Sequence, residues 1–451
     1  MTFSNDNTTI GGKPGQMMYE AIINAAKRGV QVRIAKVFTT IGAVSWRADA
    51  HTASQSMSGV FGADDVEKLA AAGYAIPAYV NYTALIGAGI LHTKFIIADN
   101  RSTCGRVCVR RPADVCGLLV VAAFSVGSAN MDWRSLTQVK EFGIYFPDAP
   151  TVASELVKVF EQYWILGTKH AIPAQWPASL ETEYTIESPM HISMNGTESD
   201  LFFSLSPPPA QPKSWSLDSE AITHAMFAAE DFIWIEVMDY MPAQIYVEPQ
   251  VYWNTIDNAI RKASYKYVCT IAPVFAAVRV ASTTIHGCEH WVLDCSNKTE
   301  VRLLIGYWEH SIPVQQNYVQ SLNALPNVTV KYFIVPRMWR VQCPACNVCT
   351  WLTVALSCTE YKVNIPYTRV NHAKWMVTDK QLFIDTSNWY VRARVALLCQ
   401  AFTVARRTGD YFTNTAGVGT NTNNVAAQRK GVEVFLRDWN SEYTHDIPPS
   451  P

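Results

Sequence analysis

The chain has 451 residues, which is long enough for two domains that each bury a core. Its 37 lysines and arginines nearly balance its 38 aspartates and glutamates, so the formal net charge at pH 7 is −1. This balance excludes a protein that binds nucleic acid through overall positive charge, and any basic surface must be local. No apolar run reaches the ~20 residues that span a bilayer, and residues 1–30 lack the pattern of a signal peptide.

The first half of the chain alternates between helical and strand patterns. These patterns are separated by short polar or glycine-containing breaks. After a polar loop over residues 1–14, the sequence predicts a helix, a strand, a second helix, the strand of the first histidine motif and a closing helix, at 15–28, 30–37, 63–72, around His92 and at 151–164.

A proline-rich stretch follows this half. Leu205–Trp215 contains three successive prolines, which favour an extended and stiff connection. We therefore expect a first domain over residues 1–204, a linker over 205–215 and a second domain over 216–451.

The second half repeats the pattern of the first. It predicts a strand, a helix, a strand, the strand of the second histidine motif and a closing helix, at 232–241, 251–264, 301–305, around His372 and at 435–439. A repeat of this length suggests an α/β protein with two halves related by a pseudo-twofold axis. Only the second half opens with a strand before its first helix. We infer that one strand of the first sheet, with any membrane anchor, precedes residue 1.

The most informative signal is a short motif that occurs twice. Both copies read His-x-Lys-x4-Asp, and they consist of His92, Lys94 and Asp99, then of His372, Lys374 and Asp379. On a strand, a histidine and a lysine two positions apart share one face, so an imidazole and an ammonium point the same way. Each copy is followed by a turn of small residues that ends in asparagine, at 127–130 and 385–388. One copy would be a weak signal, but two copies with matching turns indicate a symmetric site.

This pattern resembles the phospholipase D superfamily. The stretches 127–141, 365–372 and 437–446 resemble more specifically its animal lysosomal subgroup, the third and fourth phospholipases D. The resemblance implies two tandem α/β sandwich domains with one active site at their interface. It also implies a phosphodiesterase of the endolysosomal or ER/Golgi lumen that uses no cofactor and acts as a 5′ exonuclease on single-stranded DNA or RNA. The subgroup has an N-terminal signal anchor, which is missing from this sequence.

The two motifs supply the groups that phosphodiester cleavage needs, namely a nucleophile, a proton donor for the leaving oxygen and positive charge around the phosphate. By resemblance, His92 forms a phosphohistidine and His372 acts as acid and base, although the sequence alone does not order them. Lys94 and Lys374 would hold the nonbridging oxygens without a metal. Further hydrogen bonds to the phosphate would come from the residues of the two turns, Ser128, Asn130, Thr386 and Asn388.

Carboxylates have other expected roles. Glu141 stands where the family places a carboxylate that orients the first histidine and stabilises its imidazolium form. The matching region of the second half, 413–417, has no carboxylate, which indicates unequal roles for the two histidines. Asp99 and Asp379 fall on the opposite strand face from histidine and lysine, and we interpret them as structural partners.

Some features leave other functions open. Asp385 replaces a glycine of the family, which puts a side chain at a position where positive φ is easier for glycine and adds negative charge beside a bound phosphate. A catalytically impaired relic that binds phosphate is therefore one alternative, and a phospholipase or transphosphatidylase on membrane lipid is another. Aromatic residues near the motifs could stack on bases, although core packing is the simpler interpretation for Phe95, Trp133, Trp375 and Trp389. A homodimer is also left open.

Four segments interrupt the family pattern, at 100–123, 267–297, 339–361 and 390–407. They contain all 11 cysteines of the chain, and we hypothesise that they are translated intron sequence. One alternative is a zinc site formed by Cys343, Cys346, Cys349 and Cys358. Another is a set of disulfides, in which the odd count leaves one cysteine unpaired. Sequons for N-glycosylation fit a lumenal protein, and they begin at Asn7, Asn81, Asn100, Asn195, Asn297 and Asn327.

Overall fold

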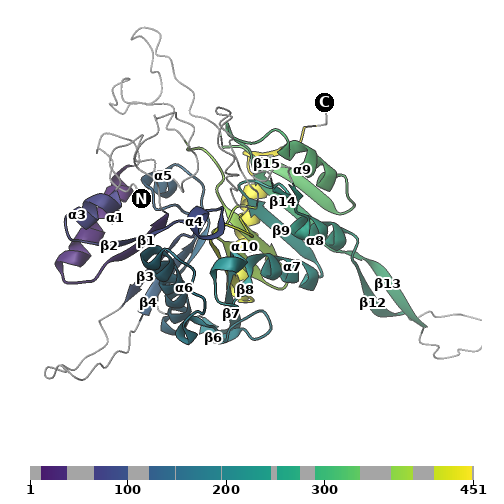
Figure 1. The fold of residues 1–451 in the computed structure, drawn as a ribbon. Coiled ribbons are helices and arrows are strands. Elements are labelled where there is room, and N and C mark those ends of the chain that lie inside the picture. The colour runs from purple at the N-terminus through teal and green to yellow at the C-terminus, as the bar shows by residue number, and fades with distance from the viewer. Residues whose placement is uncertain are drawn as a thin grey trace, which may run out of the picture.

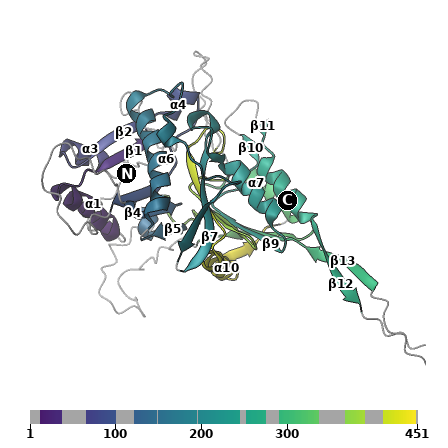
Figure 2. The same cartoon turned by 90° about the horizontal axis from the view of Figure 1, so that it is seen from below.

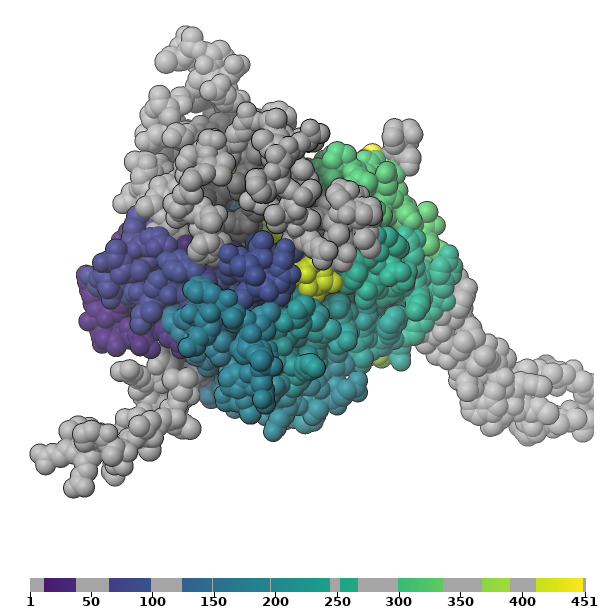
Figure 3. Space-filling view, viewed as in Figure 1, coloured from purple at the N-terminus to yellow at the C-terminus, as the bar shows by residue number. Residues whose placement is uncertain are grey.

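The fold is that of a computed structural model, which describes residues 12–37, 65–99, 121–147, 149–194, 196–244, 251–274, 290–335, 367–389 and 411–448. Two lobes lie side by side in Figure 1. The first half of the chain runs from purple to dark teal, and the second half from teal to yellow. In the space-filling view of Figure 3, described atoms of the two halves abut one another on the visible face.

A ten-stranded sheet forms the second lobe, with the strand order β19-β15-β14-β9-β16-β17-β18-β7-β6 and β8 beside β7. Strands β9, β14 and β15 are parallel, and β16, β17, β18 and β7 continue the sheet in antiparallel pairs. The strands span Met190–Met194 (β6), Thr197–Ser206 (β7), Ser216–Leu217 (β8), Phe232–Val237 (β9), Glu300–Gly306 (β14), Val328–Phe333 (β15), Lys374–Thr378 (β16), Leu382–Asp385 (β17), Gly417–Thr422 (β18) and Thr444–Asp446 (β19).

Helices cover both faces of this sheet, so β9, β16, β17 and β18 are buried along almost their whole length instead of alternating between buried and exposed positions. In β16, Met376 packs in the same buried cluster as residues of α7 (Asp218–Ala228), α8 (Thr255–Ser264) and α9 (Gln315–Asn323). Its neighbours Trp375 and Val377 face the other way, into the cluster of α10 (Val425–Trp439). The second motif therefore starts a strand that is anchored on two cores.

Two smaller sheets form the first lobe. Strands β1 (Arg33–Val37) and β2 (Ile76–Val80) pair in parallel, and β3 (Phe95–Asp99), β4 (Val121–Gly127) and β5 (Gly143–Phe146) form an antiparallel sheet. The long helix α6 (Pro150–Lys169) contacts strands of both sheets. The other helices are α1 (Gly12–Lys27), α3 (Asp65–Ala71), α4 (Tyr82–Ile86) and α5 (Trp133–Thr137). This is the second α/β unit that the repeat predicts.

The lobes differ at one strand. In the second lobe β9 lies between β14 and β16 and pairs with both. In the first lobe β1 pairs with β2 and β3 pairs with β4, and no strand of the described residues joins β1 to β3. The difference matches the strand that the internal comparison of the sequence finds only in the second half.

The proline-rich stretch is not the extended linker that its composition suggests. Leu205 and Ser206 end β7, whose partner is β18, and a 3₁₀ turn follows at Pro208–Ala210. Ala210 and Trp215 are buried. These residues are therefore part of the packed body, and the division of the chain at 204 and 216 stays a prediction.

Of the four cysteine-containing segments, the structure describes mainly the second. It forms a hairpin of β12 (Tyr267–Val274) and β13 (His290–Lys298), which projects from the body in Figures 1 and 2. The segments at 339–361 and 390–407, and residues 100–120 of the first, lie outside the described residues, as does the proposed zinc set. Within the described ranges, no group of histidine, cysteine and carboxylate side chains could hold a metal ion. None of the helices in those ranges is long and apolar enough to cross a membrane.

Candidate active site

Both motif histidines lie in extended segments that lead into a strand. β3 begins at Phe95 and β16 at Lys374, so His92 and His372 precede their strands instead of lying within them. Both side chains are buried, with 1% and 6% of their surface exposed. The expectation that each histidine shares a strand face with its lysine is therefore wrong in detail, although both pairs stay close together.

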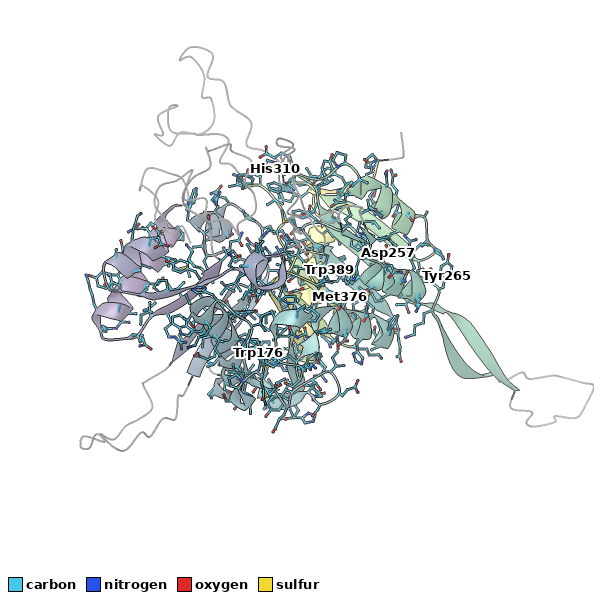
Figure 4. The ribbon with its side chains drawn as sticks, viewed as in Figure 1. Trp176, Asp257, Tyr265, His310, Met376 and Trp389 are labelled. Atoms are coloured by element: carbon cyan, nitrogen blue, oxygen red, sulfur yellow. The ribbon has the colours of Figure 1, made fainter. Side chains whose placement is uncertain are left out.

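Each motif is held by the opposite lobe. The backbone amide of His92 donates to the carbonyl of Ala416 at 3.1 Å, and that of His372 donates to the carbonyl of Lys140 at 2.8 Å. A parallel β-bridge extends each contact. Ala416 belongs to the second half and Lys140 to the first. Each lobe therefore accepts a backbone hydrogen bond from the histidine of the other, and this exchange of hydrogen bonds brings both motifs to the junction of the lobes. Met376, two residues beyond Lys374, lies in this central region in Figure 4.

Glu141 orients the second histidine, and the expectation that it serves the first is wrong. Its two carboxylate oxygens lie 2.8 and 3.0 Å from Nδ1 of His372, and one of them also accepts the hydroxyl of Ser128 at 2.6 Å. The reason is the exchange itself, since Lys140 and Glu141 run beside Asn371 and His372. Burial lowers the pKa of His372 to about 4, although Glu141 opposes the shift. Burial would raise the pKa of Glu141, but His372, Lys374 and Ser128 lower it overall.

His92 has no such partner. Among the described residues neither of its ring nitrogens makes a hydrogen bond of normal geometry, and the ring of Tyr411 meets it edge-on with centroids 4.8 Å apart. Burial and the neighbouring Lys94 and Lys374 hold the pKa of His92 well below its usual range, and the backbone of Thr386 opposes this. The imidazole of His372 also contributes to the lowering, which places the two rings within electrostatic reach of each other.

The two lysines are buried and lie within electrostatic reach of each other. Nζ of Lys94 donates to the carbonyl of His92, and Nζ of Lys374 donates to the carbonyl of His372 at 2.7 Å. Burial lowers the pKa of Lys94 well below its usual value and lowers that of Lys374 to about 8, while Glu141 and Asp385 oppose both shifts. Each ammonium keeps donors that are not used by its carbonyl contact, and these could meet a phosphate oxygen.

The turn hydroxyls belong to the frame of the site. The amide of Phe142 donates to Oγ of Ser128 at 2.8 Å, and the amide of Val418 donates to Oγ1 of Thr386 at 2.9 Å. These contacts are equivalent in the two lobes and fix each turn on the next strand. The hydroxyl of Ser128 donates its one proton to Glu141, so it has no donor left for the predicted contact with phosphate.

The asparagines of the turns remain candidates for phosphate contacts. Asn388 is buried with 5% of its surface exposed, and its Oδ1 has no hydrogen-bonding partner among the described residues. Asn130 is half-buried and lines a cavity of about 210 Å³ together with Lys94 and Glu141. Apolar side chains, among them Met18 of α1 and Leu136 of α5, form much of the remaining wall.

Asp385 does not strain the backbone, contrary to the expectation from the glycine that it replaces. It ends β17 opposite Gly419 of β18, and its φ is not positive. In the first lobe the equivalent pair is Gly127 and Gly143, where a Cβ on Gly127 would lie 2.6 Å from the carbonyl oxygen of Phe142. The second lobe therefore has room for a side chain that the first lobe excludes.

The two motif aspartates lie at or just beyond the ends of their strands. Asp379 accepts the backbone amide of Glu230 at 3.0 Å and forms an ion pair with Lys380 at 3.3 Å. This contact ties the turn after β16 to the start of β9 and agrees with a structural role. Asp99 is the last residue of β3.

Sequence reasoning missed a buried network behind the second motif. Nζ of Lys140 forms ion pairs with Glu236 and, at 3.1 Å, with Asp438, and the amide side chain of Asn371 donates to Glu236 at 2.9 Å. The signal available in the sequence was the charged neighbour of Glu141. These contacts hold Lys140 beside Asn371, and this places Glu141 next to His372.

Three of the four aromatic residues near the motifs are core residues, and the fourth, Phe95, is half-buried against the core of the first lobe. Trp133, Trp375 and Trp389 have at most 3% of their surface exposed, which confirms the simpler interpretation and excludes them as platforms for bases. Trp389 lies near the centre of the molecule in Figure 4.

Family comparisons agree with this architecture. The family described as "PLD3/4, PLD-like domain" matches residues 118–274, and the one described as "Cardiolipin synthase, PLD-like domain" matches residues 7–164. The chain belongs to the phospholipase D superfamily and consists of two tandem domains of that type.

Individual relatives place the chain more narrowly within the superfamily. The chain is 34% identical over 435 residues to "Probable phospholipase D F09G2.8" of Caenorhabditis elegans, and it covers 61% of that protein. It is 30% identical over 438 residues to "Phospholipase D Z" of Dictyostelium discoideum, with 97% of this chain and 78% of that protein covered. It is 32% identical over 372 residues to the human "5'-3' exonuclease PLD3", with 80% of this chain and 58% of that protein covered. Within the superfamily the chain thus falls in the animal PLD3 subgroup, and it spans about 60% of the length of several of the relatives that it matches.

Proposed function

We propose that this chain hydrolyses phosphodiesters through a phosphohistidine on His92, and that its substrate is single-stranded DNA or RNA, cut from the 5′ end. The observation that supports this most directly is the exchange of backbone hydrogen bonds, because it delivers one histidine and one lysine from each lobe to one junction. The name of the human relative supports the exonuclease activity. The endolysosomal lumen is part of the proposal on the subgroup resemblance alone.

The surroundings of the two rings support unequal roles. His92 is buried among cationic neighbours and keeps a neutral ring with a free lone pair, as a nucleophile needs. His372 has Nδ1 on Glu141, so Nε2 is the atom left to carry a proton, and a bound phosphate anion would favour its imidazolium form.

The reaction has two steps. A ring nitrogen of His92 attacks phosphorus, the bond to the leaving oxygen breaks, and Nε2 of His372 gives that oxygen a proton. Water then attacks the phosphohistidine, His372 takes the proton of the water, and the phosphorus–nitrogen bond breaks to restore both rings. Lys94 and Lys374, with the side chains of Asn130 and Asn388, stabilise the negative charge on the equatorial oxygens.

A direct test compares substrates and variants. We expect 5′-hydroxyl single-stranded oligonucleotide to be shortened from its 5′ end, and His92→Ala and His372→Ala each to lower kcat by at least about 10³-fold. Turnover of phosphatidylcholine vesicles in preference to the oligonucleotide would support the phospholipase alternative, which the names of the worm and Dictyostelium relatives favour. Equal and negligible turnover of both substrates by all three proteins would support the relic.

A further inference from the structure

Two carboxyl groups are buried together beneath the second catalytic turn. Asp385 stands opposite Gly419 in the register of β17 and β18. Asp218, the first residue of α7, accepts the amide of the same Gly419 at 3.1 Å and the hydroxyl of Ser204 at 2.7 Å. Neither aspartate has any exposed surface. The mechanism above uses neither of them.

Each carboxyl group has one satisfied and one unsatisfied oxygen. Oδ1 of Asp385 accepts the amides of Thr386 at 2.6 Å and Ser387 at 2.9 Å. Among the described residues, Oδ2 of Asp385 and Oδ2 of Asp218 have no hydrogen-bonding partner of normal geometry, although the nearby hydroxyl of Ser206 acts to lower the pKa of Asp218. A buried anionic oxygen without a donor is costly, and two neighbouring carboxylates cannot both ionise cheaply, so one proton on the pair removes both costs.

Electrostatic interactions connect the two aspartates to the lysines that would bind the phosphate. Asp385 interacts electrostatically with Lys374 at the start of β16 and with Lys94 before β3. Both aspartates also act electrostatically on Tyr163 of α6. Burial and then Asp218 raise the pKa of Asp385 well above its usual range, and Lys374 and the two turn amides oppose this. Burial raises the pKa of Asp218 to about 6.

We propose that Asp385 is a positioning residue that sets the pH range of phosphate binding: it shares one proton with Asp218, and when the proton leaves, the second carboxylate weakens binding of an anionic phosphate between Lys94 and Lys374. The inference rests on the proposed function, since it concerns the same site. The first lobe has no such device, because Gly127 leaves no room for a side chain.

The test measures binding of inorganic phosphate by calorimetry at pH 5 and pH 7.5, with kcat and KM on the oligonucleotide beside it. Asp385→Asn keeps the acceptor for the turn amides but cannot ionise. At pH 7.5 it should bind phosphate about tenfold more tightly than the wild type, and at pH 5 about equally. The change should appear in KM more than in kcat. Glu230→Gln, an exposed carboxylate paired with Lys380, serves as the control and should behave as the wild type.

A second variant separates titration from structure. Asp218→Asn removes the neighbouring charge that keeps the proton on Asp385, so the loss of phosphate affinity should move to lower pH. A purely structural role predicts no such movement. If Asp385→Asn does not fold, the movement in Asp218→Asn decides alone. An active enzyme whose phosphate affinity has the same pH dependence in all variants would overturn the inference. Phosphate binding with the predicted pattern, but no turnover of any phosphodiester, would overturn the proposed function and leave the inference standing.

Discussion

The two histidine motifs share one frame but differ in what surrounds each ring. In both lobes a turn hydroxyl accepts a strand amide, and the histidine amide donates to the opposite lobe. Glu141 then follows Lys140, whereas Gly417 follows Ala416 at the equivalent place. A Cβ at Gly417 would collide with Oγ of Ser387, so a carboxylate could take the position beside His92 only if that hydroxyl moved. The lesson is that a duplicated fold keeps its backbone contacts while one side chain makes the two histidines unequal.

The first prediction removes the network that delivers Glu141. Lys140→Ala leaves the buried Glu236 without its cation and Asp438 with only Arg437, and we expect the free energy of unfolding to fall by about 3–5 kcal/mol. Urea denaturation followed by circular dichroism measures the change. Lys430→Ala, which breaks an exposed pair with Glu433, is the control. Equal small effects in both variants would show that the crossing does not depend on this network.

The second prediction removes the carboxylate that makes the two histidines unequal. Glu141→Gln keeps the shape but no longer stabilises the imidazolium of His372, and we expect kcat to fall by about 10²-fold with little change in KM. An aryl phosphodiester whose leaving group needs no proton should lose less. A uniform loss on both substrates would assign Glu141 to the frame instead of to proton transfer.

The third prediction concerns stability against pH. The pKa of His372 is about 4 in the folded chain and ordinary, about 6.5, in the unfolded chain. Between these values the unfolded chain binds the extra proton, so stability falls as pH drops from about 6.5 to about 4. The lowered pKa of Glu141 acts in the same direction at its acid end. His372→Gln should flatten this part of the curve, measured as melting temperature at pH 7 and 4.5, while His445→Gln, at an exposed position, should not.

The smallest expected effect compares two equivalent arginines. Arg33 lies 4.1 Å from the ring centroid of Trp164 and pairs with Glu161. Arg302 lies 5.1 Å from that of Trp234 and 5.4 Å from that of Trp439, and it pairs with Glu300. Planar guanidinium stacks better than ammonium, so we expect Arg33→Lys to cost about 1 kcal/mol and Arg302→Lys less. Urea titrations of both variants measure the order, and the reverse order would contradict this account of the stacking.

Much of the framework could be predicted from local sequence. The paired motifs, the turns ending in Asn130 and Asn388, and the order of helices and strands depend on patterns within a few residues, and strand β9 was visible as a difference between the halves. Contacts between lobes were not predictable in this way. The family resemblance assigned Glu141 to the first histidine, and nothing in its sequence neighbourhood shows that it runs beside His372.

Two further expectations, one from composition and one from the family resemblance, also differ from the structure. Three prolines suggested a linker at 205–215, but Leu205 and Trp215 are buried, because the partner strand β18 comes from much later in the chain. Asp385 suggested backbone strain, because the opposing Gly419 that gives it room cannot be recognised without the strand register. In both cases a distant strand decided the outcome.

Mapping the covalent intermediate would test most directly whether the two lobes contribute unequal histidines to one reaction. The enzyme is mixed with an oligonucleotide, quenched in base within its first turnovers, digested and analysed by mass spectrometry. We predict a nucleotidyl phosphate adduct on His92. An adduct on His372, or turnover with no adduct on either ring, would contradict the account.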